Sequence, residues 1–139
     1  MYRIVRERID VPELQAALAS PACGGAVTFV GIVRERADDG RLVDGLSYEA
    51  FESMALAVFE EIAAEAARRF EGARVAIAHR IGDCNVGDVA VAVVAASEHR
   101  GAAFDACEYA IDELKARAPI WKKERYADGS AVWRENACE

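Results

Sequence analysis

The densest group of candidate reactive side chains lies in residues 113–125, ELKARAPIWKKER. Five cations stand there against two carboxylates, although the whole chain carries a formal net charge of −7: Lys115, Arg117, Lys122, Lys123 and Arg125. Clustered positive charges disfavour further protonation, so one lysine here could lose its proton readily. A neutral lysine can act as a base or attack an acyl carbon, whereas a charged one can bind an anion or stabilise an oxyanion.

Ordinary structural roles are equally open for these lysines. Lys115 falls at the end of an expected helix, where a cation complements the helix dipole. Strand alternation places Ile120 and Lys122 on one face and Trp121 and Lys123 on the other, so one lysine should lie on the enclosed side. A charged edge strand that resists aggregation explains this pair as well as chemistry does.

A second candidate site is SEHRG, residues 97–101, where an expected buried strand meets an expected helix. His99 and Arg100 fall at the start of that helix, where backbone N–H groups are unpaired and the dipole end is positive. Such a pair can bind a phosphate or a carboxylate. The alternative is that Ser97 or Glu98 only caps the helix while Arg100 is solvated.

Other charged residues carry a weaker signal. Arg34, Arg36 and Arg41 lie in a charged segment with a glycine and could extend an anion site. A solvated loop is the better interpretation for Arg36 and Arg41. We expect His79 and Arg80, at the end of a predicted strand, to be structural or surface residues.

The cysteines favour a reducing compartment and no metal. They form no C-x-x-C pair, and no His stands at ligand spacing from any of them: Cys23, Cys84, Cys107 and Cys138. A zinc site is therefore not expected, and packing is the expected role of Cys84 and Cys107. The first residues contain no secretion signal, and the longest apolar run is far too short to span a bilayer. We expect a cytoplasmic protein.

Periodicity and turn residues predict the elements that must position these groups. Strands are expected at 2–9, 26–33, 46–51, 73–82, 89–98, 120–127 and 131–135, and helices at 10–20, 53–70 and 101–117. The inner face of the last helix is expected to carry Phe104, Cys107, Ile111 and Leu114. The order β-α-β-β-α-β-β-α-β-β is typical of an α+β fold with a mixed, largely antiparallel sheet and three main helices. We expect one domain over residues 1–139.

Four segments, taken together and in order, resemble the large, catalytic subunit of molybdopterin synthase, the MoaE family. They are GAVTFVGIVR (25–34), HRIGDCNVGD (79–88), SEHRGAAFDA (97–106) and LKARAPIWKKE (114–124). The last segment is the most specific, and the resemblance runs over nearly the whole chain. It implies the fold of that subunit.

The resemblance also implies a reaction and partners. Members of this family convert cyclic pyranopterin monophosphate into molybdopterin by installing two dithiolene sulfurs. The sulfur arrives on a small ubiquitin-like subunit as a C-terminal Gly-Gly thiocarboxylate, whose tail enters a pocket of the large subunit. The large subunit is a homodimer with one small subunit at each far end, which makes a heterotetramer. The step needs no metal, and we expect no cofactor.

Carried over by motif, the two active-site lysines of the family fall on Lys115 and Lys122, to which we assign acid/base chemistry and handling of an acyl intermediate. Substrate binding is assigned to a second set: Arg34, His99, Arg100, the pocket aromatic Phe29, and as further candidates Lys123 and Arg134. The C-terminal tail does not align securely, so Arg134 is a candidate contributed across the dimer.

Two other functions remain to be weighed against sulfur transfer. A non-catalytic adaptor that only docks a ubiquitin-like protein would bind the partner without turning over the pterin. Docking alone would not demand two lysines together with a His-Arg pair. A nucleic-acid binder is disfavoured, because an isoelectric point near 4.9 gives no basic face to displace counterions.

Overall fold

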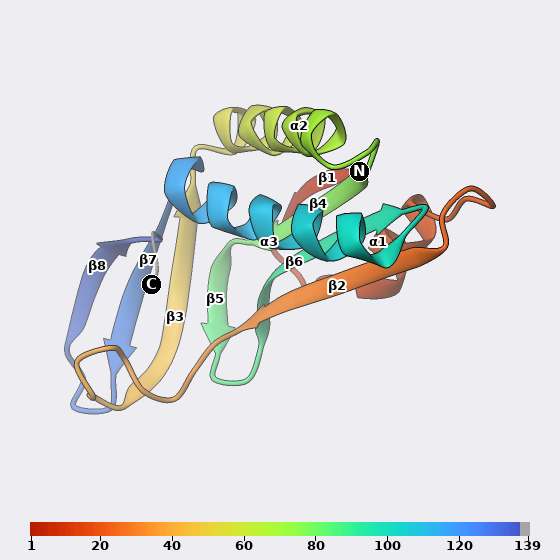
Figure 1. The fold of residues 1–139 in the computed structure, drawn as a ribbon. Helices are drawn as coiled ribbons and strands as arrows, with labels where there is room; N and C mark the ends of the chain where they lie inside the picture. The colour runs from red at the N-terminus through yellow and green to blue at the C-terminus, as the bar shows by residue number, and fades with distance from the viewer. Residues whose placement is uncertain (137–139) are drawn as a thin grey trace.

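The computed structural model describes residues 1–136 (Figure 1). Within them the strands are β1 (Tyr2–Val5), β2 (Gly25–Ile32), β3 (Val43–Ala50), β4 (Arg74–Arg80), β5 (Gly82–Asn85), β6 (Val89–Ser97), β7 (Ile120–Tyr126) and β8 (Ala131–Glu135). The helices are α1 (Val11–Ala17), α2 (Glu52–Arg69) and α3 (Arg100–Arg117). The strands divide between two four-stranded sheets, in the orders β1-β4-β6-β2 and β5-β3-β7-β8.

The expected α+β class with a mixed, largely antiparallel arrangement and three helices is confirmed. The pair β1–β4 is parallel, whereas the other paired strands are antiparallel. Two expectations were wrong. The strands form two sheets where one was expected, and the short strand β5 was not predicted, so the observed order is β-α-β-β-α-β-β-β-α-β-β.

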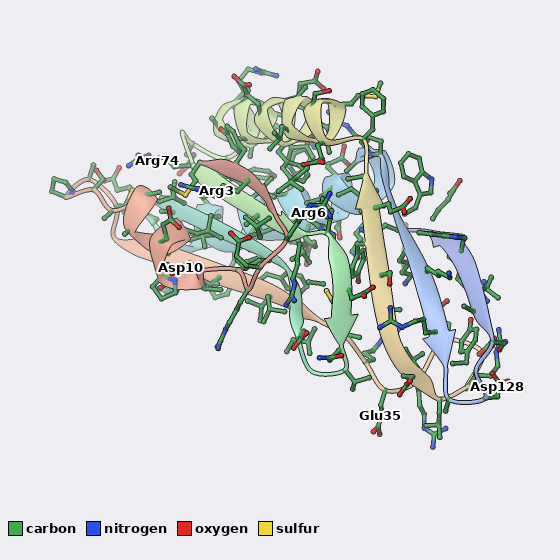
Figure 2. All side chains as sticks on the ribbon, turned by 180° about the vertical axis from the view of Figure 1, so that it is seen from behind. Arg3, Arg6, Asp10, Glu35, Arg74 and Asp128 are labelled. Atoms are coloured by element: carbon green, nitrogen blue, oxygen red, sulfur yellow. The ribbon has the colours of Figure 1, made fainter. Side chains whose placement is uncertain are left out.

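The first sheet is covered on both faces. Successive side chains of a strand point to opposite faces, so β4 and β6 supply two separate apolar clusters. One cluster packs with α2 and α3, and the other packs with α1 and its buried Leu14. Helix α1 begins as predicted: Asp10 is its cap, and the carboxylate accepts a hydrogen bond from the Glu13 N–H at 3.1 Å. Figure 2 shows Asp10 at this helix start.

Helix α3 buries a stripe made mostly of alanine. Its buried residues are Ala103, Ala106, Cys107, Ala110 and Leu114. The predicted inward position of Phe104 was wrong, because that side chain is 60% exposed, and Ile111 is only partly buried. Small side chains on the inner face let the helix lie close to β6 and β2, so its position is set by close backbone approach.

The second sheet stands beside the first, and α3 runs from one to the other (Figure 1). The helix ends at Arg117, and Pro119 separates it from β7 because proline cannot continue a helix. Figure 2 shows Glu35 and Asp128 at the same end of this sheet, on the segment before β3 and in the β7–β8 turn. Within the described residues, no helix has both the length and the apolar character that crossing a bilayer requires.

Candidate functional site

A cleft of about 350 Å³ opens between the two sheets at the C-terminal end of α3. Its walls come from β2 and the segment after it, from β3, β6 and β7, and from the last turn of α3. A cleft of this size is large enough for a small-molecule ligand. Phe29 and Tyr48 supply aromatic surface to its lining.

Four cations line this space, which we call the cationic cleft: Arg34, Arg36, Lys115 and Lys122. Lys115 comes from α3 and Lys122 from β7, so residues on two elements meet in one place. The short connection of residues 118 and 119 makes this possible, because it takes the chain directly from the end of α3 into β7. The sequence-predicted residues Arg34, Phe29, Lys115 and Lys122 are thus brought together in the structure.

The loop arginines are partly engaged with neighbours on their own segment. An Nη of Arg34 donates to Asp38 at 2.8 Å, and both side chains are at least half exposed. An Nη of Arg36 donates to the carbonyl of Gly40 at 3.1 Å. Exposed ion pairs are weak and exchange with other anions readily. These arginines can therefore serve an anionic ligand, and Arg36, interpreted above as solvated, lies at the cleft.

One carboxylate, that of Glu124, belongs to the lining. Its side chain is buried and is ion-paired with the guanidinium of Arg134 on the neighbouring strand β8. Arg134 also donates to the hydroxyl of Tyr126 at 3.5 Å, and this contact together with Glu124 raises the pKa of Arg134. Arg134 thus neutralises Glu124, so the cleft keeps its positive character.

Lys122 and Lys123 lie on opposite faces of β7, as strand alternation predicts. Lys122 lines the cationic cleft, whereas the Nζ of Lys123 lies 5.8 Å from the centre of the Trp133 ring. Lys123 and Trp133 instead border a second hollow, formed with the start of β5. The structure therefore does not bring Lys123 or Arg134 into the lining of this cleft within one chain.

His99 and Arg100 lie at the opposite end of α3 from Lys115. Arg100 and Lys115 are fifteen positions apart, which corresponds to about 22 Å along a helix. His99 caps the helix through its backbone with no side-chain bond, so neither Ser97 nor Glu98 is the cap. The His99 side chain is 76% exposed, with Glu98 3.7 Å away. Within one chain, this pair and the two lysines do not share a site.

One residue of the cleft lining and two buried residues behind it were missed by sequence reasoning or given no role. Tyr48 lines the cleft, whereas the sequence predicted only a strand at this position and no role for the tyrosine. His79 is fully buried beneath Tyr48, with the two ring centres 5.0 Å apart in an edge-to-face arrangement. Asn136, which follows β8, accepts a hydrogen bond from Lys115 at 3.2 Å. Nothing in the sequence distinguishes this asparagine from any other.

The cysteines that the structure describes provide no reactive thiol at the cleft. Cys84 and Cys107 are buried, and burial raises the pKa of both thiols, that of Cys107 to about 11. Cys138 lies outside the described residues. Across residues 1–136, no three His, Cys, Asp or Glu side chains are grouped so that they could hold a metal ion.

Comparison with known proteins identifies close relatives. A family model described as MoaE protein matches residues 4–117. The molybdopterin synthase catalytic subunit of a Nostoc species is 45% identical over 140 aligned residues, which cover 99% of this chain and 84% of that protein. The subunit of the same name from Bacillus subtilis is 41% identical and covers 92% of this chain and 81% of its own length.

Solved structures agree with the sequence relatives. The crystal structure of molybdopterin synthase from Staphylococcus aureus superposes with a TM-score of 0.89 at 35% identity, covering 94% of both chains. A protein–protein complex of subunits 1 and 2 of molybdopterin-converting factor from Helicobacter pylori gives a TM-score of 0.78 at 27% identity. That match covers 96% of this chain and 90% of the other.

Proposed function

Because the chain belongs to the MoaE protein family, we propose that it is the catalytic subunit of a molybdopterin synthase in molybdenum cofactor biosynthesis. In this role it transfers sulfur from the C-terminal thiocarboxylate of a small ubiquitin-like subunit to cyclic pyranopterin monophosphate. The observation that carries the proposal is the cationic cleft, in which Lys115 and Lys122 stand beside Arg34 and Arg36.

The reaction brings together two anions, a thiocarboxylate and a cyclic phosphate. Two like charges repel each other, and the net charge of −7 on the protein would repel both. A cleft lined by four cations reverses the local potential and lowers the energy of bringing the reactants together. The ring of Phe29 at the cleft offers an apolar surface to the flat pterin.

We assign to the two lysines the steps in which a proton is transferred or an acyl carbon is attacked. In the neutral form, either amine can remove a proton or attack the acyl carbon that carries the sulfur. In the charged form, either can stabilise the oxyanion that develops at that carbon. We assign these steps to Lys115 and Lys122, and we assign binding of the phosphate and the thiocarboxylate to the arginines.

His99 and Arg100 contribute to the site across a homodimer. The length of α3 keeps them away from the lysines of their own chain, and their exposed side chains leave them able to meet another protomer. Each cleft would then combine Lys115 and Lys122 of one protomer with the His-Arg pair of the other. With a small subunit bound at each far end, the assembly is a heterotetramer. A role of Arg134 in the opposite cleft remains a proposal of the same kind.

The test is reconstitution with the pterin precursor and a thiocarboxylated small subunit, in which dithiolene product and protein mass are measured together. Wild type is expected to form product. Lys115→Ala and Lys122→Ala are expected to lose at least about 100-fold in rate while they keep the fold and the small-subunit affinity. Wild-type rates in both variants would remove the catalytic role from these lysines.

The same experiment distinguishes sulfur transfer from a docking adaptor. An adaptor binds the small subunit and gives no product with any variant, including wild type. Small-subunit affinity measured by calorimetry beside product formation therefore separates the two functions. The cation pair in the cleft favours catalysis, because docking a protein tail alone would not require two lysines from different elements.

A further inference from the structure

A chain of hydrogen bonds leads from Lys115 into the core. The Nζ of Lys115 donates to Oδ1 of Asn136 at 3.2 Å, and Nδ2 of Asn136 lies 3.2 Å from Nε2 of His79. The other ring nitrogen, Nδ1, lies 2.7 Å from the carbonyl oxygen of Arg80. The three side chains come from α3, from the residue after β8, and from β4, so the chain joins both sheets and the helix.

Both inner members of this chain are enclosed. His79 has no exposed surface, and Asn136 is 3% exposed. The backbone N–H of Asn136 donates to the carbonyl of Ile120 at 3.2 Å, which fixes the residue against the start of β7. The His79 ring is held edge to face against Tyr48. Neither side chain can therefore turn away without leaving a buried polar atom unpaired, which is costly.

The direction of every proton in the chain is determined. The Arg80 carbonyl can only accept, so Nδ1 of His79 carries the proton and Nε2 is an acceptor. Asn136 must then present its NH₂ to His79, which leaves its oxygen facing Lys115. Reversing the amide would place the lone pairs of the Asn136 oxygen against the lone pair of Nε2, 3.2 Å away. The direction is thus the same whether Lys115 is charged or neutral.

The imidazole keeps this arrangement over a wide pH range. Burial lowers the pKa of His79 to about 4, and the positive charge of Lys115 acts in the same direction. The ring is therefore neutral at every pH well above 4, and Nε2 stays an acceptor. Asn136 accordingly always accepts a hydrogen bond from the Lys115 amine, and the lone pair of a neutral Lys115 cannot point toward Asn136.

We propose that Asn136 and His79 are positioning residues for Lys115: they fix one N–H of its amine and so set the directions of the other two positions on the nitrogen, which include the lone pair of the neutral amine. Neither residue lines the cationic cleft, so neither is a catalytic residue. The inference deepens the proposed function, because it assumes that the Lys115 amine takes part in the reaction. The competing interpretation is that the side chains of His79 and Asn136 only fill space in the core.

Two substitutions of His79 separate the interpretations, because one keeps the ring shape without the hydrogen-bond acceptor and the other keeps an acceptor without the ring. His79→Phe keeps a ring against Tyr48 and removes the acceptor. His79→Gln loses the ring but can place Oε1 near the former Nε2, where it accepts from Asn136. Positioning predicts that Gln is better tolerated than Phe, whereas packing alone predicts the reverse. Asn136→Leu has a similar shape and removes the hydrogen bonds to both Lys115 and His79, so it should disturb the Lys115 amine in the same way as His79→Phe.

The first readout is turnover in the reconstituted synthase. His79→Phe and Asn136→Leu are expected to lower kcat by about 10- to 100-fold with little change in KM, because misplaced reacting groups slow the chemical step without removing a substrate contact. His79→Gln is expected to stay within several-fold of wild type. Phe performing as well as Gln or better, with both proteins folded, overturns the proposal.

Two readouts do not depend on turnover. The chain has two histidines, so ¹⁵N-histidine NMR resolves His79 from the exposed His99, and we expect His79 as the Nδ1–H tautomer. Acetylation by an N-hydroxysuccinimide ester, measured by peptide mass spectrometry as the Lys115 to Lys123 ratio, should change in His79→Phe and Asn136→Leu and not in His79→Gln. An Nε2–H tautomer, or equal ratios in all variants, refutes the positioning. If wild type gives no product but the His79 tautomer and the acetylation ratios are as expected, the proposed function fails and the positioning of Lys115 stands.

Discussion

Tyr48 and Lys122 lie directly opposite each other on β3 and β7, and both side chains line the cationic cleft. One residue further along, Lys123 pairs with Ser47 and its side chain turns to the other face, against Trp133. The two lysines are adjacent in sequence and identical in chemistry, and differ in the face that they occupy.

This difference gives a matched pair of variants. Lys122→Ala is expected to lower the rate of product formation by at least about 100-fold, because it removes a group that can move a proton at the reacting centre. Lys123→Ala is expected to keep most of the rate, since its ammonium lies outside the cleft. Steady-state kinetics of the two proteins checks this. Equal losses would mean that Lys123 also reaches the substrate.

The shared site of the homodimer can be tested by complementation between two inactive chains. Lys115→Ala and Arg100→Ala homodimers should each be inactive. Mixed dimers place one complete site beside one doubly defective site, so random mixing should restore about a quarter of the wild-type activity. The measurement is product formation after the two chains are unfolded together and refolded. No recovery from a mixture that forms mixed dimers would place both residues in the same protomer's site or outside any site.

Glu65 of α2 should stabilise the fold in a defined range of pH. Hydrogen bonds from Arg117 and then from Tyr109 lower its pKa to about 2, below the value of about 4.3 expected in the unfolded chain. Because the folded pKa is the lower one, the stabilisation is complete above about 4.3 and disappears as the pH falls through the folded value near 2.

Denaturant unfolding of Glu65→Gln against wild type checks this dependence. The variant should be less stable at pH 7, and the difference should narrow steadily between about pH 4.3 and pH 2. Glu61→Gln is the control, since Glu61 is 64% exposed and also contacts Arg117, at 3.3 Å. Its effect should be small throughout. A constant difference for Glu65→Gln would show that its carboxylate charge contributes nothing to stability.

Burial should make two thiols unreactive in the native protein. Burial raises the pKa of Cys107 to about 11 and also raises that of Cys84, so few thiolates form at pH 8. Iodoacetamide should label the partly exposed Cys23 before Cys84 and Cys107, which should be labelled only after unfolding in urea. Peptide mass spectrometry measures the order. Rapid native labelling of Cys107 would contradict its packing against β6.

Gly45 should be essential for the close approach of three strands. A Cβ at this position of β3 would lie 2.8 Å from the carbonyl oxygen of Cys84 on β5, a backbone atom that cannot move alone. Gly45→Ala should therefore destabilise the fold by about 1–3 kcal/mol. At Gly101 of α3 a Cβ meets nothing within 4 Å, so Gly101→Ala should be neutral or gain up to about 1 kcal/mol. Equal effects in denaturant unfolding would contradict this.

The sequence predicted the long elements and missed those without an apolar signal. Apolar residues at helical spacing predict helix α2, and a long apolar run predicts strand β6. Strand β5, Gly82–Asn85, is short and polar, and exists because its backbone pairs with β3. Phe104 was placed inward by its type, whereas α3 buries alanines, which carry little hydrophobic contrast.

Only the site residues that belong to recognisable sequence motifs were predictable. Lys115, Lys122, Arg34 and Phe29 follow from quoted segments and meet in the cleft. The contact of Asn136 with Lys115 is a tertiary relation between two segments, and no local pattern encodes it. The same holds for His79, whose burial depends on how the two sheets meet.

The division into two sheets also has a mechanical consequence. Lys115 lies on α3, which packs on the first sheet, whereas Lys122 lies in the second sheet, and residues 118 and 119 alone join α3 to β7. The spacing of the two amines is thus a function of the inter-sheet angle. A tilt of a few degrees would alter it while every strand ladder stayed intact. Asn136 follows the second sheet and is hydrogen-bonded both to Lys115 of the helix and to Ile120 of β7, so it links the two bodies beside the cleft.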